Sequence, residues 1–247
     1  MPVYDEAKRV GKALGAVDKA MVGVGVDYEV LVVNDGSRDQ TAEKVNGYIN
    51  GGKNSRIQLL SYTPNKGKGY ALHMGAERCT GDVVTFLDGD AEVKLDEMAS
   101  YLSALDHTDL VIGCKYHPES VVKSPLMRRF LSNGFRLLVA LMLKPGVCDT
   151  QSGVKLFRTS ALRRILPLLS VKHYAFDVEV LTVAKLLGLR VKEVPVQLEL
   201  KCHGFSPRAI IRMFVDLLGI AYRMRVLGWY QKNMNNHHPM YKPIVDW

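Results

Sequence analysis

The sequence predicts an α/β protein whose mainly parallel sheet is flanked by helices. Up to about residue 200, short runs rich in β-branched residues alternate with longer stretches of helical periodicity. Strands that alternate with helices in this way pair in parallel through right-handed crossovers. Small polar and acidic residues directly follow two of the strand-like runs, at Asn34 and at Asp88. Because the ligand crevice of such sheets lies beyond the carboxyl ends of the strands, these residues are candidates for a site.

The elements can be placed one after another along the chain. We predict strands at residues 29–34, 57–61, 83–87 and 110–113, and helices at 5–21, 40–50, 69–78 and 95–105. The chain begins with Met1-Pro2-Val3-Tyr4-Asp5-Glu6, loop-like residues that lead straight into the first helix. A sheet of this kind needs a strand just before them. The first strand is therefore predicted to be truncated, which would expose the edges of its two neighbours.

The chain changes character after residue 205. Residues 207–228 carry large apolar side chains at helical spacing, with arginines on that face and at its ends. Such a basic amphipathic helix can lie in a membrane interface, or it can pack on the sheet or on a second subunit. Residues 132–143 are a second candidate of the same kind. We divide the chain into a domain at 1–205, a basic amphipathic helical segment at 206–232 and a tail at 233–247.

The composition is that of a globular protein with an excess of positive charge. The chain has 33 Lys and Arg against 25 Asp and Glu, a net charge of +8. This favours an anionic partner such as nucleic acid, a phosphorylated substrate or an acidic membrane surface. Nucleic acid is disfavoured, because no recognisable binding module is present and the aromatic residues are not interleaved with the basic ones. The longest strictly apolar run, residues 137–143, is far shorter than the roughly 18 to 20 residues that span a bilayer.

Three acidic residues follow the apolar run 83–87. Asp88, Asp90 and Glu92 are spaced two apart, so on extended backbone they share one face and can converge. Carboxylate oxygens in such a group are ligands for Mg²⁺ or Mn²⁺, often together with the oxygens of a bound diphosphate. The alternative is a solvated turn after a buried strand. The stretch alone does not decide between them.

Three further motifs accompany the acidic cluster. They are Pro2-Val3-Tyr4-Asp5-Glu6, the run VNDGSRDQT at 33–41 and Asn65-Lys66-Gly67-Lys68-Gly69. The second turns from a strand into a helix that Ser37 or Asp39 could cap. The third is a basic, glycine-rich turn whose amides and ammonium groups suit phosphate oxygens. Each motif alone is explained equally well by turn and cap chemistry, but their order and spacing are specific.

Taken together, the motifs resemble the nucleotide-binding half of family 2 glycosyltransferases of the GT-A fold, which is Rossmann-like. In that family P-x-Y-N/D-E, V-D/N-D-G-S-x-D-x-T, N-x-G-x-G and D-x-D follow one another in this order. The blocks DTQSGVKLF at 149–157 and YAFDVE at 174–179 are similar to the dolichyl-phosphate β-glucosyltransferase branch, close to dolichyl-phosphate mannose synthases. The resemblance covers about residues 2–205. It implies an inverting, metal-dependent hexosyltransferase that uses Mg²⁺ or Mn²⁺, with UDP-glucose favoured as donor.

The resemblance also implies roles for residues around the donor. The nucleotide would be bound by Pro2, Tyr4, Glu6, Asp35, Lys66, Gly67 and Asp88. Asp88 and Asp90 would hold the metal that bridges the diphosphate. Glu92 stands where relatives place a third ligand, commonly Gln.

A second set of implied roles concerns the sugar and the acceptor. The lipid phosphate would be bound by Lys115, Arg128, Ser132 and Lys201. Relatives often have Arg at the positions of Lys115 and Lys201, which would allow bidentate contacts that Lys cannot make. Asp149, Gln151 and Asp177 would face the sugar, and together with Asp90 they are the candidate catalytic residues.

The chemistry depends on the acceptor. Cleavage of a nucleotide-sugar bond develops negative charge on the departing diphosphate, which a divalent cation and nearby lysines neutralise. A phosphate monoester has a second pKa of about 6 and needs no strong base near neutral pH. A hydroxyl acceptor needs a carboxylate to take its proton, and Asp149 or Asp177 would be the candidate.

The expected partners are a nucleotide sugar, a dolichyl or other polyprenyl phosphate and a membrane surface. The expected location is the cytoplasmic side of a membrane, which is the endoplasmic reticulum in a eukaryote and the plasma membrane in a prokaryote. Two other functions stay open: transfer to a hydroxyl of a glycan or glycolipid, and a non-catalytic nucleotide-sugar-binding subunit of a membrane glycosylation complex. The intact acidic cluster disfavours the non-catalytic subunit. The sequence does not determine the sugar, the base, the acceptor lipid or the oligomeric state.

Overall fold

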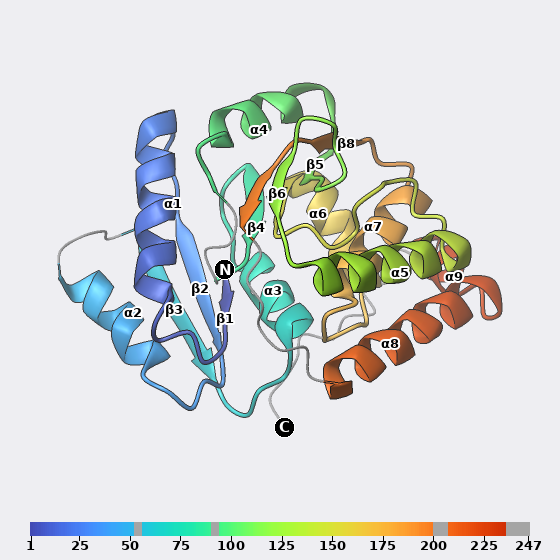
Figure 1. Ribbon diagram of the computed structural model, residues 1–247, viewed down its shortest axis with the longest axis horizontal. Helices are drawn as coiled ribbons and strands as arrows, with labels where there is room; N and C mark the ends of the chain where they lie inside the picture. The colour runs from blue at the N-terminus through green and yellow to red at the C-terminus, as the bar shows by residue number, and fades with distance from the viewer. Residues whose placement is uncertain (52–55, 90–93, 200–206, 236–247) are drawn as a thin grey trace.

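The computed structural model describes residues 1–51, 56–89, 94–199 and 207–235 and shows two neighbouring sheets with helices packed around them (Figure 1). The first sheet is parallel and has the strand order β1 (Pro2–Val3), β2 (Val30–Asp35), β3 (Ile57–Tyr62). Val32 belongs to an apolar cluster with α1 and α2, whereas Val33 faces α3. Because both faces of β2 are covered, its sequence is a continuous apolar run.

The second sheet contains one antiparallel strand. Its order is β4 (Val83–Leu87), β7 (Val154–Arg158), β5 (Leu110–Gly113), β8 (Val191–Val194), and β7 runs antiparallel to both of its neighbours. A short parallel pair, β6 (Val121–Lys123) and β9 (Gln197–Glu199), lies beside it. The α/β class and the mainly parallel pairing are confirmed, and each predicted strand is present. The sequence analysis did not assign β7, whose apolar run is interrupted by Lys155.

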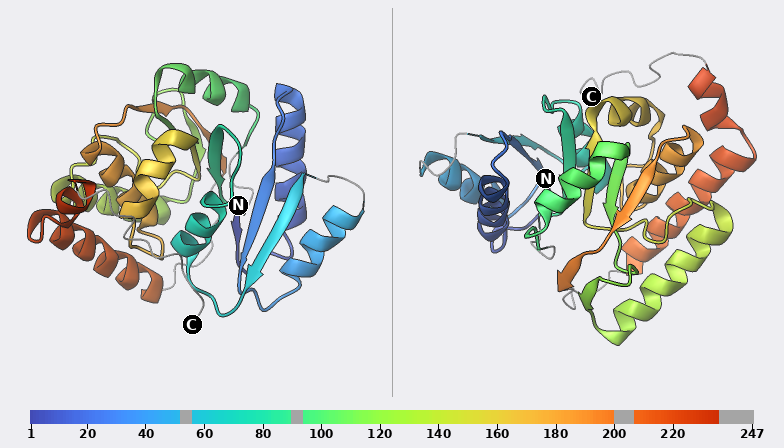
Figure 2. Two further views of the ribbon diagram at one scale, coloured as in Figure 1. Left: turned by 180° about the vertical axis from the view of Figure 1, so that it is seen from behind. Right: turned by 90° about the horizontal axis from the view of Figure 1, so that it is seen from above.

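The helices pack around the sheets in separate groups. Their bounds are α1 (Val10–Val24), α2 (Thr41–Asn50), α3 (Lys68–Ala76), α4 (Met98–Ala104), α5 (Leu126–Met142), α6 (Thr159–Ile165), α7 (Phe176–Leu186), α8 (Pro207–Arg225) and α9 (Trp229–Asn235). Views from behind and from above show α1 and α2 at one end of the molecule and α5, α8 and α9 at the other (Figure 2). The guanidinium of Arg225 donates to the Leu141 carbonyl at 3.2 Å and so joins α8 to α5.

The structure corrects two expectations about the start of the chain. Pro2 and Val3 form strand β1 and pair in parallel with Val33 and Asn34 of β2, instead of forming a loop. Helix α1 begins at Val10 and not at residue 5, because Asp5 has a positive φ of 53° that no helix accommodates. The first strand is present, although it is only two residues long, and it pairs with β2, so the edge of β2 is not exposed there as expected; among the described residues β4 pairs only with β7.

The largest apolar cluster lies around α7, where every residue from 176 to 184 is buried. It includes the rings of Phe86 in β4 and Phe157 in β7, whose centroids are 4.8 Å apart. The inner faces of α8 and α9 also belong to it, through Leu217, Ile220 and Tyr230. One face of α8 therefore packs on the domain, which is one of the two roles that the sequence left open for it. The domain boundary at residue 205 stays a prediction.

Glu179 of α7 anchors these C-terminal helices. It is 0% exposed and accepts hydrogen bonds from the amides of Ser170 at 2.9 Å and Val171 at 2.8 Å. Arg223 of α8 and Tyr230 of α9 donate to the same carboxylate at 3.1 Å and 2.6 Å. A buried carboxylate is tolerated only when charged and hydrogen-bonding partners replace its water. The carboxylate thus fixes α8 and α9 to α7.

Removing this carboxylate should destabilise the protein. We expect Glu179→Ala to lower the free energy of unfolding by about 3–5 kcal/mol, because Arg223 and Tyr230 lose a buried partner. Urea unfolding followed by circular dichroism measures the change. Glu43→Ala, which removes an exposed carboxylate from α2, is the control and should cost about 1 kcal/mol or less. Equal effects of the two substitutions would show that Glu179 is not an anchor.

Candidate active site

The residues that the sequence singled out gather beyond the carboxyl ends of β2 and β4. The turn at 65–69 is hydrogen-bonded to Asp35, at the end of β2. The Asp88 amide, just after β4, donates to the Gly153 carbonyl at 3.3 Å. The first turns of α3 and α7 bring Lys68 and Asp177 to the same place. The motifs that are far apart in the sequence therefore form one site.

Asp35 fixes the conformation of the glycine-rich turn at residues 65–69 through hydrogen bonds. It is 3% exposed and accepts hydrogen bonds from the amides of Lys66 at 2.7 Å and Gly67 at 2.9 Å. Nδ2 of Asn65 donates to the same carboxylate at 2.9 Å. Gly67 has a φ of 102°, and a Cβ there would lie 2.3 Å from Nδ1 of His173, so only glycine fits. A nucleobase would meet a carboxylate that is already fixed by the chain.

The segment after β1 lies against the turn that follows β2. The Glu6 amide donates to Oγ1 of Thr41 at 2.8 Å. Of the two candidate capping residues, Asp39 accepts the amide of Thr41, the first residue of α2, at 2.9 Å. Ser37 instead accepts the Asp5 amide at 3.0 Å.

The predicted nucleotide-binding residues of this segment differ in their surroundings. Pro2 lies in β1, and Tyr4 is 41% exposed. The Glu6 carboxylate is paired with Arg9, with an oxygen 2.6 Å from Nε. Tyr4 therefore presents an exposed ring, whereas the charge of the Glu6 carboxylate is neutralised by Arg9.

Four charged side chains alternate in sign through the centre of the site. The ammonium of Lys68 lies 2.8 Å from an oxygen of Asp88 and 3.2 Å from an oxygen of Asp177. The other oxygen of Asp177 lies 2.9 Å from the ammonium of Lys155. We call this set, in the order Asp88, Lys68, Asp177, Lys155, the charge network. Asp177 and Lys155 are buried, whereas the side chains of Lys68 and Asp88 are 21% and 31% exposed.

The charge network shifts the pKa of Asp177 and of Lys68 toward their charged forms. Burial acts to raise the pKa of Asp177, but the charges of Lys155 and Lys68 outweigh it and hold the pKa below its usual range. Burial acts to lower the pKa of Lys68, but the charges of Asp177 and Asp88 outweigh it and raise the pKa. Asp177 is therefore a poor proton acceptor near neutral pH.

Asp149 is a further buried carboxylate of the site. It is 2% exposed and accepts hydrogen bonds from the amides of Lys115 and Gln151, each at 3.1 Å. The ammonium of Lys115 lies 3.2 Å from it. The Gln151 side chain donates from Nε2 to the sulfur of Met213 in α8 at 3.2 Å. Both predicted sugar-facing residues on this loop are thus held by the fold.

A small pocket brings the predicted acceptor and sugar residues together. We call it the Lys115 pocket, and it is lined by Lys115, Tyr116, Ser132, Phe135, Arg136, Asp149, Thr150 and Gln151. Arg128 lies one helical turn before Ser132 on α5 and is half-buried, but it does not line the pocket. Lys201 lies outside the described residues. Two of the four predicted phosphate-binding residues therefore meet two of the predicted catalytic ones.

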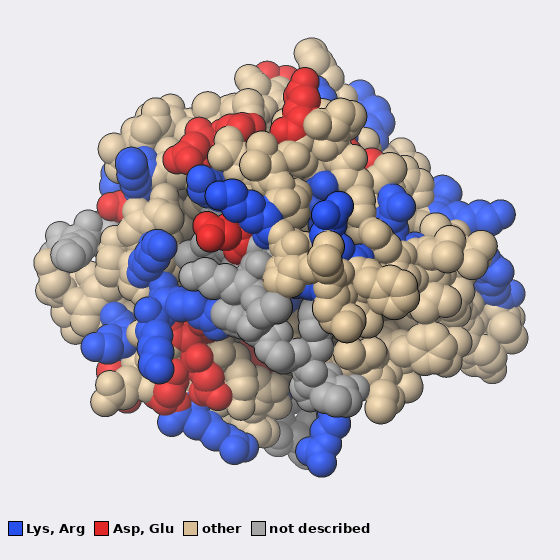
Figure 3. Space-filling model, viewed as in Figure 1, with Lys and Arg blue, Asp and Glu red and all other residues tan. Residues whose placement is uncertain are grey.

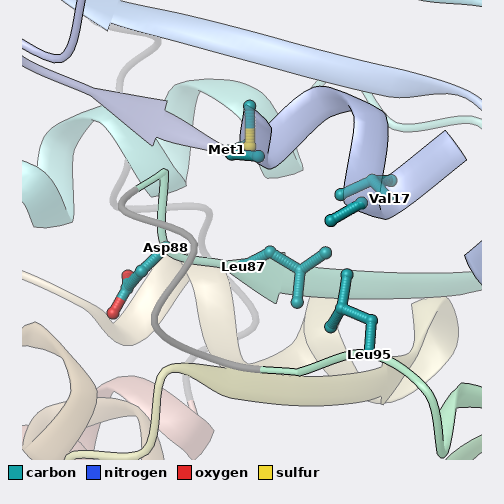
Figure 4. A pocket seen from close by; sticks show the side chains of 7 residues that line it. Met1, Val17, Leu87, Asp88 and Leu95 are labelled. Atoms are coloured by element: carbon teal, nitrogen blue, oxygen red, sulfur yellow. The ribbon is translucent and has the colours of Figure 1, made fainter. Parts of the chain in front are cut away.

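The metal site is described only in part. Asp90 and Glu92 lie outside the described residues, and within the described ranges no three potential ligands are grouped. Asp88 is described, and its carboxylate points away from a mostly apolar pocket lined by Met1, Val17, Leu87 and Leu95 (Figure 4). Asp88 contributes to the wall of that pocket, and the other side chains that line it are apolar. The candidate site is therefore on the side of Asp88 that faces Lys68.

Lys155 and Arg136 were not predicted from the sequence to have a role in the site. A signal for Lys155 was present, since a lysine within an apolar strand is buried only when a carboxylate meets it. Lys68 was noted as part of the basic turn, but its pairing with Asp177 is a contact between residues 109 positions apart. No periodicity or motif predicts a contact of that range.

Comparison with known proteins identifies similar sequences. The profile of glycosyl transferase family 2 matches residues 1–166. A dolichyl-phosphate beta-glucosyltransferase of Trichomonas vaginalis is 33% identical over 248 residues, which cover 94% of this chain and 73% of that protein. The dolichyl-phosphate beta-glucosyltransferase of Homo sapiens is 29% identical, and the match covers 93% of this chain and 76% of that protein.

Solved structures agree on the fold. The glucosyl-3-phosphoglycerate synthase of Mycobacterium tuberculosis in complex with UDP has a TM-score of 0.63 at 19% identity, covering 89% of this chain and 78% of that one. Its complex with Mn²⁺, UDP-glucose and phosphoglyceric acid has a TM-score of 0.62 at 18% identity, covering 89% and 77%. At these identities the likeness shows a shared GT-A-like fold.

The charge network predicts a pH-dependent contribution to stability. We expect Asp177→Asn to lower the free energy of unfolding near neutral pH by about 3–5 kcal/mol, because Lys155 keeps a buried charge without its partner. The pKa of Asp177 is lower in the folded protein than in the unfolded chain. Its contribution is therefore fully present above the unfolded pKa of about 3.9 and is lost as pH falls through the folded pKa.

Urea unfolding at a series of pH values measures this effect. The gap between wild type and Asp177→Asn should stay constant from about pH 7 to about pH 5 and narrow below about pH 4. The exposed carboxylate of Asp96 provides the control Asp96→Asn, which should show no such gap. A gap that is absent near neutral pH, or that does not change in acid, would contradict the prediction.

Proposed function

The chain belongs to glycosyltransferase family 2, and we propose that it transfers glucose from UDP-glucose, with inversion, to the phosphate of a dolichyl or other polyprenyl lipid. We propose the cytoplasmic surface of a membrane as its place of action. The observation that carries the proposal is the Lys115 pocket, where Lys115 and Ser132 lie beside Asp149 and Gln151. The names of the relatives at about 30% identity point to the same acceptor.

The proposed donor site uses the residues around the glycine-rich turn. We assign the nucleotide to Pro2, Tyr4, Glu6, Asp35, Lys66 and Gly67. The carboxylates of Asp88, Asp90 and Glu92 would hold Mg²⁺ or Mn²⁺, the cations that fit an all-oxygen donor set. When bound, such a cation neutralises the charge that develops on the departing diphosphate.

Lys68 adds a protein charge at the same point. Its ammonium lies 2.8 Å from Asp88 and is held by Asp177 on the other side. A fixed cation next to the predicted diphosphate site stabilises the leaving group without reorganisation. In the reaction an acceptor phosphate oxygen forms a bond to C1 of glucose. The bond from C1 to the diphosphate oxygen breaks on the opposite face, and its electron pair leaves with UDP.

The carboxylates of the site support a phosphate rather than a hydroxyl acceptor. Asp177 is paired with two lysines, and Asp149 is paired with Lys115 and hydrogen-bonded by two amides. Neither carboxylate is poised to take a proton from a hydroxyl. A phosphate monoester, with a second pKa of about 6, needs no such base. We propose that Asp149, Gln151 and Asp177 position the sugar.

The outer faces of α5 and α8 support a membrane-bound acceptor. Leu126 and Phe130 of α5 are 81% and 77% exposed, and Ile211 and Val215 of α8 are 63% and 57% exposed. The surface over these helices is largely free of charged side chains, with Lys and Arg at its margin (Figure 3). An apolar face with a basic rim suits an anionic membrane interface. None of the described helices is long and apolar enough to span a bilayer.

A donor and acceptor panel tests the activity. We expect transfer from UDP-[¹⁴C]glucose to dolichyl or undecaprenyl phosphate, no transfer to dolichol, and loss of transfer when EDTA removes the divalent cation. Asp88→Ala should lower kcat by roughly 100-fold or more, because the metal loses a ligand. Asp96→Ala, in an exposed position outside the site, is the matched control and should keep wild-type activity.

The other functions give different results in this panel. Transfer to dolichol would show that the acceptor group is a hydroxyl and not a phosphate. Binding of UDP-glucose without transfer to any acceptor would support a non-catalytic subunit. Full activity of Asp88→Ala would contradict the proposal that Asp88 binds the metal.

Vesicle binding tests the membrane surface. We expect the double variant Leu126→Ser, Phe130→Ser to bind phosphatidylserine-containing vesicles at least about tenfold more weakly, because two large apolar side chains no longer enter the interface. Added salt should weaken binding by wild type, since the basic rim also contributes.

Co-sedimentation with vesicles measures the partitioning. Val22→Ser on α1 removes an apolar side chain that is 67% exposed at the other end of the molecule, and it should leave binding unchanged. If the α5 double variant binds as well as this control, the apolar face of α5 has another role.

A further inference from the structure

Arg136 is a cation of the Lys115 pocket to which nothing above gives a role. It lies on α5, one helical turn after Ser132, and it lines the pocket. Its guanidinium carbon is 4.2 Å from the centroid of the Tyr116 ring. A guanidinium stacked on an aromatic face is held in place and can still offer its edge to an anion. Arg136 is thus held by the pocket wall, although it is exposed to solvent.

The pocket carries more positive than negative charge. The ammonium of Lys115 lies 5.3 Å from the same Tyr116 ring and is met by Asp149 at 3.2 Å. Arg136 forms no ion pair within the described part of the chain. Two cations and one carboxylate therefore line the pocket, and their surplus positive charge favours an anionic ligand.

Tyr116 supplies an independent observation. Its hydroxyl is buried and has no hydrogen-bond partner in the described ranges. A buried hydroxyl without a partner is costly, and a native structure generally accounts for it. The hydroxyl belongs to a residue that lines the pocket, so a bound ligand is a natural source of the missing partner.

We propose that Arg136, stacked on Tyr116, binds the phosphate group of the acceptor and makes the Lys115 pocket selective for a phosphate monoester. This inference rests on the proposed function and adds to it a specificity-determining residue. A dianionic phosphate balances the surplus charge and accepts hydrogen bonds from the planar guanidinium edge. A neutral hydroxyl of the same lipid does neither.

The test uses a water-soluble, short-chain prenyl phosphate, so that binding to a membrane does not enter. For Arg136→Ala we expect the KM for this acceptor to rise about tenfold or more, because one charge-assisted contact is lost. The KM for UDP-glucose should stay at the wild-type value. The KM of Arg136→Lys for the acceptor should lie between those of wild type and Arg136→Ala, because lysine keeps the charge but loses the planar fork and the stacking.

Arg129→Ala is the matched control. Arg129 is an exposed arginine of the same helix that does not line the pocket, and its removal changes the net charge equally. The control should keep the wild-type KM for the acceptor. A wild-type KM in Arg136→Ala, or an equal rise in Arg129→Ala, would overturn the proposal.

A binding measurement separates this inference from the proposed function. If wild type transfers glucose to no prenyl phosphate, the proposed function fails, and calorimetric titration with the prenyl phosphate still reports on Arg136. Binding about tenfold weaker in Arg136→Ala than in wild type supports the proposal, and equal binding overturns it. Titration with inorganic phosphate should show the same ratio between the proteins, because the proposed contact is to the phosphate group alone.

Discussion

The charge network is the constraint on which the arrangement of the site depends. Lys68 is the first residue of α3, which packs on the first sheet. Asp88 directly follows β4, and Lys155 lies in β7, and both of these strands belong to the second sheet. Asp177, in the first turn of α7, connects the two lysines. Because Asp177 and Lys155 are buried and a buried charge without a counter-charge is strongly unfavourable, these two side chains must stay together, and Lys68 connects Asp177 to Asp88. The network therefore sets the position of the carboxyl end of β4 relative to the glycine-rich turn, and with it the predicted diphosphate site.

A second buried carboxylate connects this site to the outer helices. Glu179 lies two residues after Asp177 on α7 and accepts hydrogen bonds from both α8 and α9. Gln151 contacts Met213 of α8, and Arg225 of α8 contacts α5. The helices that present the apolar surface are thus the same ones that complete the walls of the site. An acceptor whose apolar chain lies along α5 would reach the Lys115 pocket with its head group.

The surroundings of Asp149 and Asp177 bear on which acceptor the protein uses. Asp149 and Asp177 are both buried and both paired with lysines. Carboxylates held in this way can orient sugar hydroxyls, and the lowered pKa of Asp177 makes that residue a poor proton acceptor, which agrees with an acceptor that arrives already ionised. In the Lys115 pocket, Arg136 and Tyr116 add a positive charge and an unsatisfied hydroxyl on the same side. Both features of the site favour a phosphate.

The sequence alone determined the α/β class, each of the strands assigned from it and the family, because hydrophobic periodicity and ordered short motifs are local properties of the chain. It also predicted that Asp35 and Asp88 lie in the crevice beyond the carboxyl ends of the strands, and the family resemblance added Lys66 and Gly67 to that prediction. Only the tertiary structure showed the antiparallel β7, the pairing of Lys155 and Lys68 with Asp177, and the stacking of Arg136 on Tyr116. It also showed that α8 has one face packed in the apolar cluster around α7 and one exposed face. These features depend on which distant side chains meet and how deeply they are buried, and pairing across long stretches of chain leaves no periodic or local signal.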